Sequence, residues 1–79
     1  MTGADLKRIR KALGLSTVEM GRALGYEGAD NTVSVTVRRY ESGMRTIPPV
    51  VAVLVGMFDR HGAPPEWRRT AEAARGGGR

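Results

Sequence analysis

The sequence has no cysteine, one histidine, and few aromatic residues: one tryptophan, two tyrosines and one phenylalanine in 79 residues. Without cysteine the chain can form neither disulfides nor zinc fingers, and it fits a reducing compartment. A single histidine with scattered acids offers no metal-ligand set, and no nucleophile and base occur as a pair. We therefore expect no metal, no cofactor and no enzymatic activity.

Long apolar runs are also missing. The longest run, from Val50 to Val55, is far too short to span a membrane. No apolar segment follows the first basic residues, as a signal peptide would require. We therefore expect a cytoplasmic protein with no membrane partner.

Positive charge is plentiful and unevenly placed. Thirteen Lys and Arg residues against eight Asp and Glu residues give a net charge of +5 and a pI near 10.8. Residues 31–79 contain eight arginines, four acids and no lysine. Because the rigid arginine fork suits phosphate and guanine, this excess favours a nucleic-acid partner. The length allows one domain, expected over residues 1–74, and the Gly/Arg tail 75–79 should be disordered.

Local patterns mark two short helices at the start of the chain. Two capping boxes pair Thr2 with Asp5 and Ser16 with Glu19. The first predicted helix spans about residues 3–13 and stops at Gly14. The second begins after Ser16 and ends before Gly25. Gly21, which lacks a side chain, would let another helix axis come close to the second helix.

A third helix is predicted by the apolar residues Val33, Val37 and Tyr40, at spacings i, i+4 and i+7. It should run from about residue 32 to 40, with Asp30 or Asn31 as the N-cap. The face opposite the apolar stripe carries Asn31, Val35, Arg38, Arg39 and Ser42, with Thr32 and Ser34 at its margin. This outer face is the one that a DNA major groove would meet.

A fourth helix is predicted over residues 50–62 and a weaker fifth over residues 66–74. The fourth is apolar on more than one face, so it should have more apolar surface than the small core of the first three helices can cover. We expect a second copy of the chain to bind there. The predicted dimer contacts are Val51, Leu54, Val55, Phe58 and Trp67, and Met44 and Met57 are expected to fill the core or the interface.

From about Leu6 to Pro48, the chain resembles the Cro/C1-type helix-turn-helix family of phage and bacterial repressors. The resemblance is carried by KRIRKALGLS, by GRALG and by TVRRYESGMRTIP. It implies an all-α fold, a compact five-helix Cro/C1 repressor-like domain with a central helix-turn-helix. It also implies a structural ion pair between Arg10 and Glu41.

The sequence departs from the family pattern at two places in the helices expected to contact DNA. The segment YEGADNTVSV between Gly25 and Thr36 has about six residues more than the usual short turn. The family also favours Gln at the first position of the second helix, where it bonds a phosphate or braces a base-reading side chain. Here that residue is Thr17, whose hydroxyl can still hold a phosphate.

Most of the predicted DNA contacts lie on the third helix, and Thr17 and Arg45 lie on the elements that flank it. Base contacts are expected from Ser34, Val35, Arg38 and Arg39, and phosphate contacts from Thr17, Asn31, Thr32, Thr36, Ser42 and Arg45. Each has a plainer alternative. Arg38 and Arg39 would also suit an ordinary solvated face, and Asn31 could serve only as a cap.

The resemblance implies a sequence-specific repressor that binds an inverted-repeat operator in double-stranded DNA as a homodimer and autoregulates its own operon. Cro-like repressors, anti-CRISPR-associated regulators of phages and mobile elements, and antitoxins are family members of this size. Two alternatives stay open. One is an antitoxin that binds a toxin protein and represses the operon of the pair, and the other is an interaction scaffold that has lost DNA binding.

Overall fold

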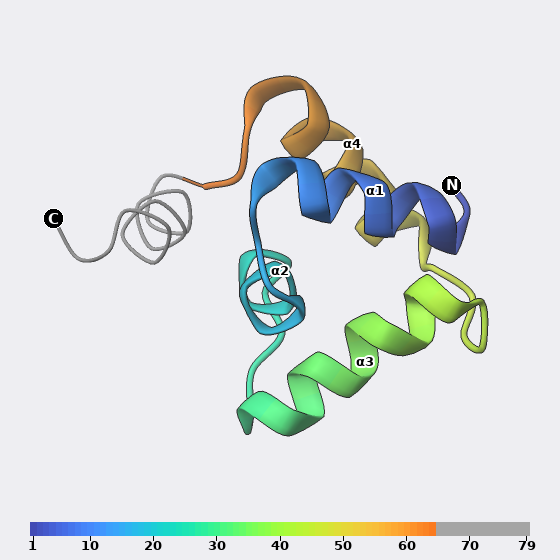
Figure 1. Cartoon of the computed structure of the whole chain (residues 1–79), viewed down its shortest axis with the longest axis vertical. Coiled ribbons are helices and arrows are strands. Elements are labelled where there is room, and N and C mark those ends of the chain that lie inside the picture. Colours follow the sequence, from blue (N-terminus) through green and yellow to red (C-terminus); the bar gives the residue numbers. More distant parts are fainter. Residues whose placement is uncertain (65–79) are drawn as a thin grey trace, which may run out of the picture.

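The computed structural model describes residues 1–64, and within that range it contains four helices and no strand (Figure 1). The helices are α1 (Gly3–Leu13), α2 (Thr17–Ala23), α3 (Asp30–Ser42) and α4 (Pro49–His61). The all-α class is therefore confirmed. The expected fifth helix and the tail 75–79 lie outside the described residues.

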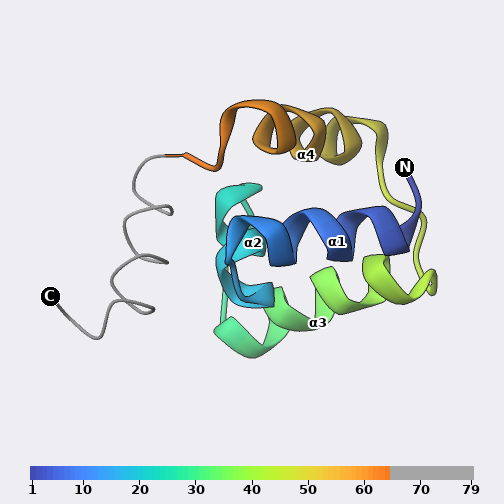
Figure 2. The ribbon, with the colours of Figure 1, turned by 45° about the horizontal axis from the view of Figure 1, so that its top comes forward.

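Helix α1 occupies the middle of the molecule. It packs against α3 on one side and α4 on the other, and α2 packs against α3 (Figure 2). No helix within residues 1–64 has the length and apolar character needed to cross a membrane.

Both predicted capping boxes are present at the starts of α1 and α2. The two helices also end alike, with a glycine of positive φ, Gly14 at 75° and Gly25 at 96°. The next amide in each case, that of Leu15 or Tyr26, donates back to a carbonyl of the last helical turn. The predicted bounds of α1 are confirmed, because local residues determine both of its ends.

Helix α3 begins earlier than the sequence pattern predicts. Its N-cap is Ala29, which makes no side-chain capping bond, so the prediction of Asp30 or Asn31 as the cap was wrong. Asp30 is instead the first helical residue, and its carboxylate lies 2.7 Å from the Arg22 guanidinium of α2. A carboxylate in the first turn also suits the helix dipole. This contact across the α2–α3 connection explains the earlier start.

The core forms where α1, α3 and α4 meet, closed by α2. Its buried apolar side chains include Leu6, Ile9, Leu15, Met20, Val37, Tyr40, Val51, Val55 and Phe58. Helices α2 and α3 cross closely at Gly21, where an added Cβ would collide with Val33. The close approach predicted for Gly21 is confirmed.

The predicted dimer contacts on α4 need correction. Val51, Val55 and Phe58 are buried in the chain's own core, so these three side chains are not free for a second copy. Leu54 packs only partly against the core and is half-buried, so its dimer contact stays a prediction. Trp67 lies outside the described residues. The apolar side chains that α4 does expose are Val50, Val53 and Met57, exposed by 66%, 62% and 49%. We call these three residues the α4 strip.

Candidate nucleic-acid interface

The outer face of α3 carries the residues predicted to contact DNA. Asn31, Thr32, Arg38, Arg39 and Ser42 are exposed, while Ser34, Val35 and Thr36 are half-buried. Arg45 is exposed just beyond the helix. The buried stripe of Val33, Val37 and Tyr40 faces the core. The predicted division of α3 into a buried and an outer face is therefore confirmed, although Thr36 already donates its hydroxyl to the Thr32 carbonyl at 3.1 Å.

Thr17 and Ser34 are brought together by the packing of α2 on α3. Their hydroxyl oxygens lie 2.7 Å apart, and either can be the donor. Because each hydroxyl has one proton and can accept two bonds, one proton of the pair remains available to a further acceptor. Thr17 thus braces a side chain of the outer face, a role that the resemblance gives to Gln at this position.

The ion pair between Arg10 and Glu41 is present and bidentate. Arg10 Nε donates to Glu41 Oε2 at 2.6 Å and Arg10 Nη2 donates to Glu41 Oε1 at 3.3 Å, while Nη1 donates to the Leu15 carbonyl at 3.0 Å. The two side chains are only 13% and 8% exposed. The pair joins α1 to the last turn of α3. It also turns the Glu41 carboxylate away from the outer face, where it would repel phosphates.

The long α2–α3 connection is anchored by contacts that the sequence patterns did not reveal. The Arg22 guanidinium donates to the carbonyls of Tyr26 and Gly28, at 3.4 and 2.7 Å, as well as to Asp30. The hydroxyls of Tyr26 and Tyr40 lie 2.7 Å apart. The extra residues therefore contact both helices, which fixes the orientation of α2 relative to α3. The opposite charges of Arg22 and Asp30, on either side of the connection, are the sequence feature that could have predicted this contact.

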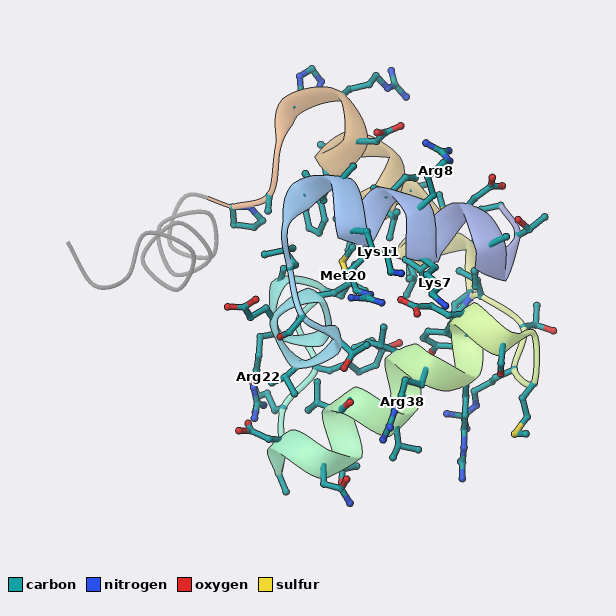
Figure 3. The ribbon with its side chains drawn as sticks, viewed as in Figure 1. Lys7, Arg8, Lys11, Met20, Arg22 and Arg38 are labelled. Carbon is teal, nitrogen blue, oxygen red and sulfur yellow. The ribbon has the colours of Figure 1, made fainter. Side chains whose placement is uncertain are left out.

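The outer face is positively charged, because its arginines take no part in the ion pairs of the described residues. Three arginines, Arg8, Arg10 and Arg22, each pair with a carboxylate. Within residues 1–64, Arg38, Arg39 and Arg45 have no such partner, and Arg60 at the end of α4 has none either. Figure 3 shows Arg38 on α3, Lys7 and Lys11 on the edge of α1 nearest α3, and Arg8 on its opposite edge. The side of the molecule that carries α3 is thus the side suited to a polyanion.

A shallow hollow lies at the C-terminal half of this face. It is lined by Val35, Arg38, Arg39, Ser42 and Met44. Met44 is 77% exposed, so it does not fill the core, and of the two expected roles only that at an interface stays a prediction. The chain turns at Gly43, whose φ is 83°, and the Met44 amide donates to Ser42 Oγ at 3.3 Å. The turn after α3 therefore adds an apolar side chain to the outer face.

Within the described part of the chain, no group of three or more His, Cys, Asp or Glu residues could hold a metal ion. No protein-family model, curated protein or solved structure matches the chain.

Proposed function

We propose that this protein is a sequence-specific DNA-binding repressor that inserts α3 into the major groove. The observation that carries the proposal is the outer face of α3. There Arg38 and Arg39 project without carboxylate partners among residues 1–64, beside the half-buried Val35. An α-helix fits the width of the major groove, and arginine can bind guanine through two hydrogen bonds.

The packing around α3 supports this role. Close contact at Gly21, the Thr17–Ser34 bond and the Arg10–Glu41 pair connect α3 to α2 and α1. Base reading requires side chains held on rigid elements, because small displacements weaken bidentate hydrogen bonds. The exposed side chains of Asn31 and Arg45 would contact phosphates on either side of the reading residues. Ser42, also predicted to do so, already donates its hydroxyl proton to the Arg39 carbonyl.

We propose further that the protein binds as a homodimer to an inverted repeat. One α3 of 13 residues reads only a few base pairs, so two copies related by a two-fold axis would supply the second half-site. Two such helices match half-sites about 34 Å apart, one turn of B-DNA. The α4 strip is the apolar surface that would join the copies. Binding at its own promoter would exclude polymerase, which makes autorepression the expected outcome.

The test is a gel-shift titration on the upstream intergenic DNA of the protein's own gene and on a scrambled fragment, at physiological salt. We expect at least about a hundredfold preference for the native fragment. That preference should be lost in the double variant Arg38→Ala/Arg39→Ala. The matched control, Arg8→Ala/Arg60→Ala, removes the same charge from α1 and α4 and should keep the preference.

Equal, salt-sensitive binding to both fragments, or none, would overturn this proposal. The α4 strip would then favour the second candidate, an antitoxin whose exposed apolar side chains hold a toxin. In that case the product of a neighbouring gene should co-purify with the wild type in equimolar amount, and Val53→Glu should abolish the association.

A further inference from the structure

We propose that the hollow on the outer face accepts the 5-methyl group of a thymine, so that Val35 and Met44 make this protein discriminate thymine from cytosine. This inference rests on the proposed function and names the base that one part of the interface reads. The hollow combines two apolar side chains with the guanidinium groups of Arg38 and Arg39 and with Ser42. In the major groove, the thymine methyl is the one apolar group on a base edge.

The exposure of Met44 supports this assignment. Because Met44 is 77% exposed, its side chain gives little stabilisation to the free protein, whereas contact with a methyl group would remove apolar surface of both from water. The position of Met44 is not left to a loose loop. Ser42 Oγ accepts from the Met44 amide at 3.3 Å and donates to the Arg39 carbonyl at 3.2 Å, and the Arg45 amide donates to the same carbonyl at 3.2 Å.

The charges around the hollow favour DNA over an apolar protein partner. Arg38 and Arg39 line it, and no carboxylate among residues 1–64 pairs with either. Val35 and Arg39 lie four residues apart, which is about 6 Å along α3, against about 3.4 Å per base pair. The thymine should therefore lie within about two base pairs of the guanine that Arg39 contacts.

The experiment begins with a duplex that wild-type protein selects from a random pool, so that it does not depend on the identity of the operator. Each thymine of the selected half-site is then replaced singly by deoxyuridine, which removes only the methyl group. We expect one position at which the replacement weakens binding about fourfold, the value for burying one methyl. 5-Bromodeoxyuridine at that position should restore binding, because bromine fills a similar volume.

Two variants locate the effect in the hollow. Val35→Ala and Met44→Ala should bind the thymine and deoxyuridine duplexes more equally, while both still prefer the selected duplex to a scrambled one. Val18→Ala makes the same change at a valine of α2 that is half-buried like Val35 but lies outside the hollow, and it should keep the full thymine preference.

A half-site without thymine, or one in which no deoxyuridine weakens binding, would overturn this inference and leave the proposed function standing. The same conclusion would follow if replacing thymine by deoxyuridine weakened the binding of Val35→Ala and wild-type protein equally. Failure of the selection to yield any preferred sequence would overturn both.

Discussion

At the scale of single residues, Arg39 and Arg45 should act on DNA in different ways. Arg39 projects from α3 into the hollow, whereas Arg45 follows the helix on the loop. Arg39→Ala should therefore cost about 1 to 3 kcal/mol on the operator and relax its sequence preference. Arg45→Ala should weaken all sequences alike and reduce the salt slope by about one unit. Titrations on operator and random DNA over a range of salt concentrations would measure both effects.

The same titrations can contradict this division. Equal losses on operator and random DNA for both variants would show that neither arginine reads a base. A loss of preference in Arg45→Ala alone would place base reading on the loop.

Glu41 is the residue on which the junction of α1 and α3 most depends. In Glu41→Ala, the Arg10 guanidinium would lose both carboxylate bonds at a site where it is 13% exposed. We expect the free energy of unfolding to fall by roughly 3 kcal/mol, at the lower end of the range for removing one partner of a buried ion pair. The loss should be at this lower end because Arg10 keeps its hydrogen bond to the Leu15 carbonyl. Urea denaturation followed by circular dichroism would measure it.

Glu27→Ala is the matched control, since Glu27 is an exposed carboxylate without an ion pair among the described residues. It should change the unfolding free energy by less than about 0.5 kcal/mol. Similar values for the two variants would mean that the pair between α1 and α3 adds no net stability.

At the scale of elements, the α2–α3 connection should make the protein sensitive to alkali. Burial, and then the hydrogen bond to Tyr40, raise the pKa of Tyr26 to about 12 from 10.0. The folded state therefore holds the Tyr26 proton more tightly than the unfolded state. The stabilisation is complete below pH 10 and is lost as the pH rises from 10 towards 12.

The variant Tyr26→Phe tests this effect. It should lose about 1 kcal/mol of stability at neutral pH, because the hydroxyl pair is broken. Its unfolding free energy should also fall less steeply than that of the wild type between pH 10 and 12. Urea denaturation at each pH would measure the unfolding free energy of both proteins. If the two free energies fell in parallel between pH 10 and 12, Tyr26 would not be the group that causes the alkaline sensitivity.

The elements that the sequence predicted well are those with local signals at both ends. Helix α1 has a capping box at Thr2 and a glycine at Gly14, and its bounds agree with the prediction. The start of α3 was predicted wrongly because it depends on Asp30 meeting Arg22, eight residues earlier. For α4, apolar residues surround the helix, so periodicity alone could not tell which valines face the core.

The candidate site shows the same division. Periodicity was enough to place Arg38 and Arg39 opposite the buried stripe of α3. It could not place Met44, because the side chain reaches the outer face only through the positive φ of Gly43. Nor could it show that Thr17 would contact Ser34, since that contact depends on how closely α2 and α3 cross.

At the scale of the whole molecule, the distribution of charged and apolar surface separates two faces. Of the arginines without an ion pair in residues 1–64, Arg38, Arg39 and Arg45 lie on or beside α3 and Arg60 ends α4. The α4 strip lies on the other side of α1 from α3 (Figure 2). A dimer joined through α4 would leave the α3 of each copy uncovered. An uncovered α3 in each copy is what the proposed binding to an inverted repeat requires.

This arrangement predicts that Val53→Glu yields monomers. Val53 is 62% exposed, so the charge should leave the fold intact while opposing contact between two α4 strips. Light scattering during size exclusion should give twice the chain mass for the wild type and the chain mass for the variant, with unchanged circular dichroism. Operator affinity should fall sharply, because each monomer holds one half-site.

Two comparisons make the result specific to the α4 strip. Ala4→Glu adds the same charge at an exposed position of α1 and should remain dimeric. Phe58→Glu, by contrast, should unfold the chain, because Phe58 is 7% exposed in its own core. A dimeric Val53→Glu protein would move the interface away from α4. A monomeric wild type that still binds the inverted repeat tightly would instead mean that the two copies meet only on DNA, each held by its own α3.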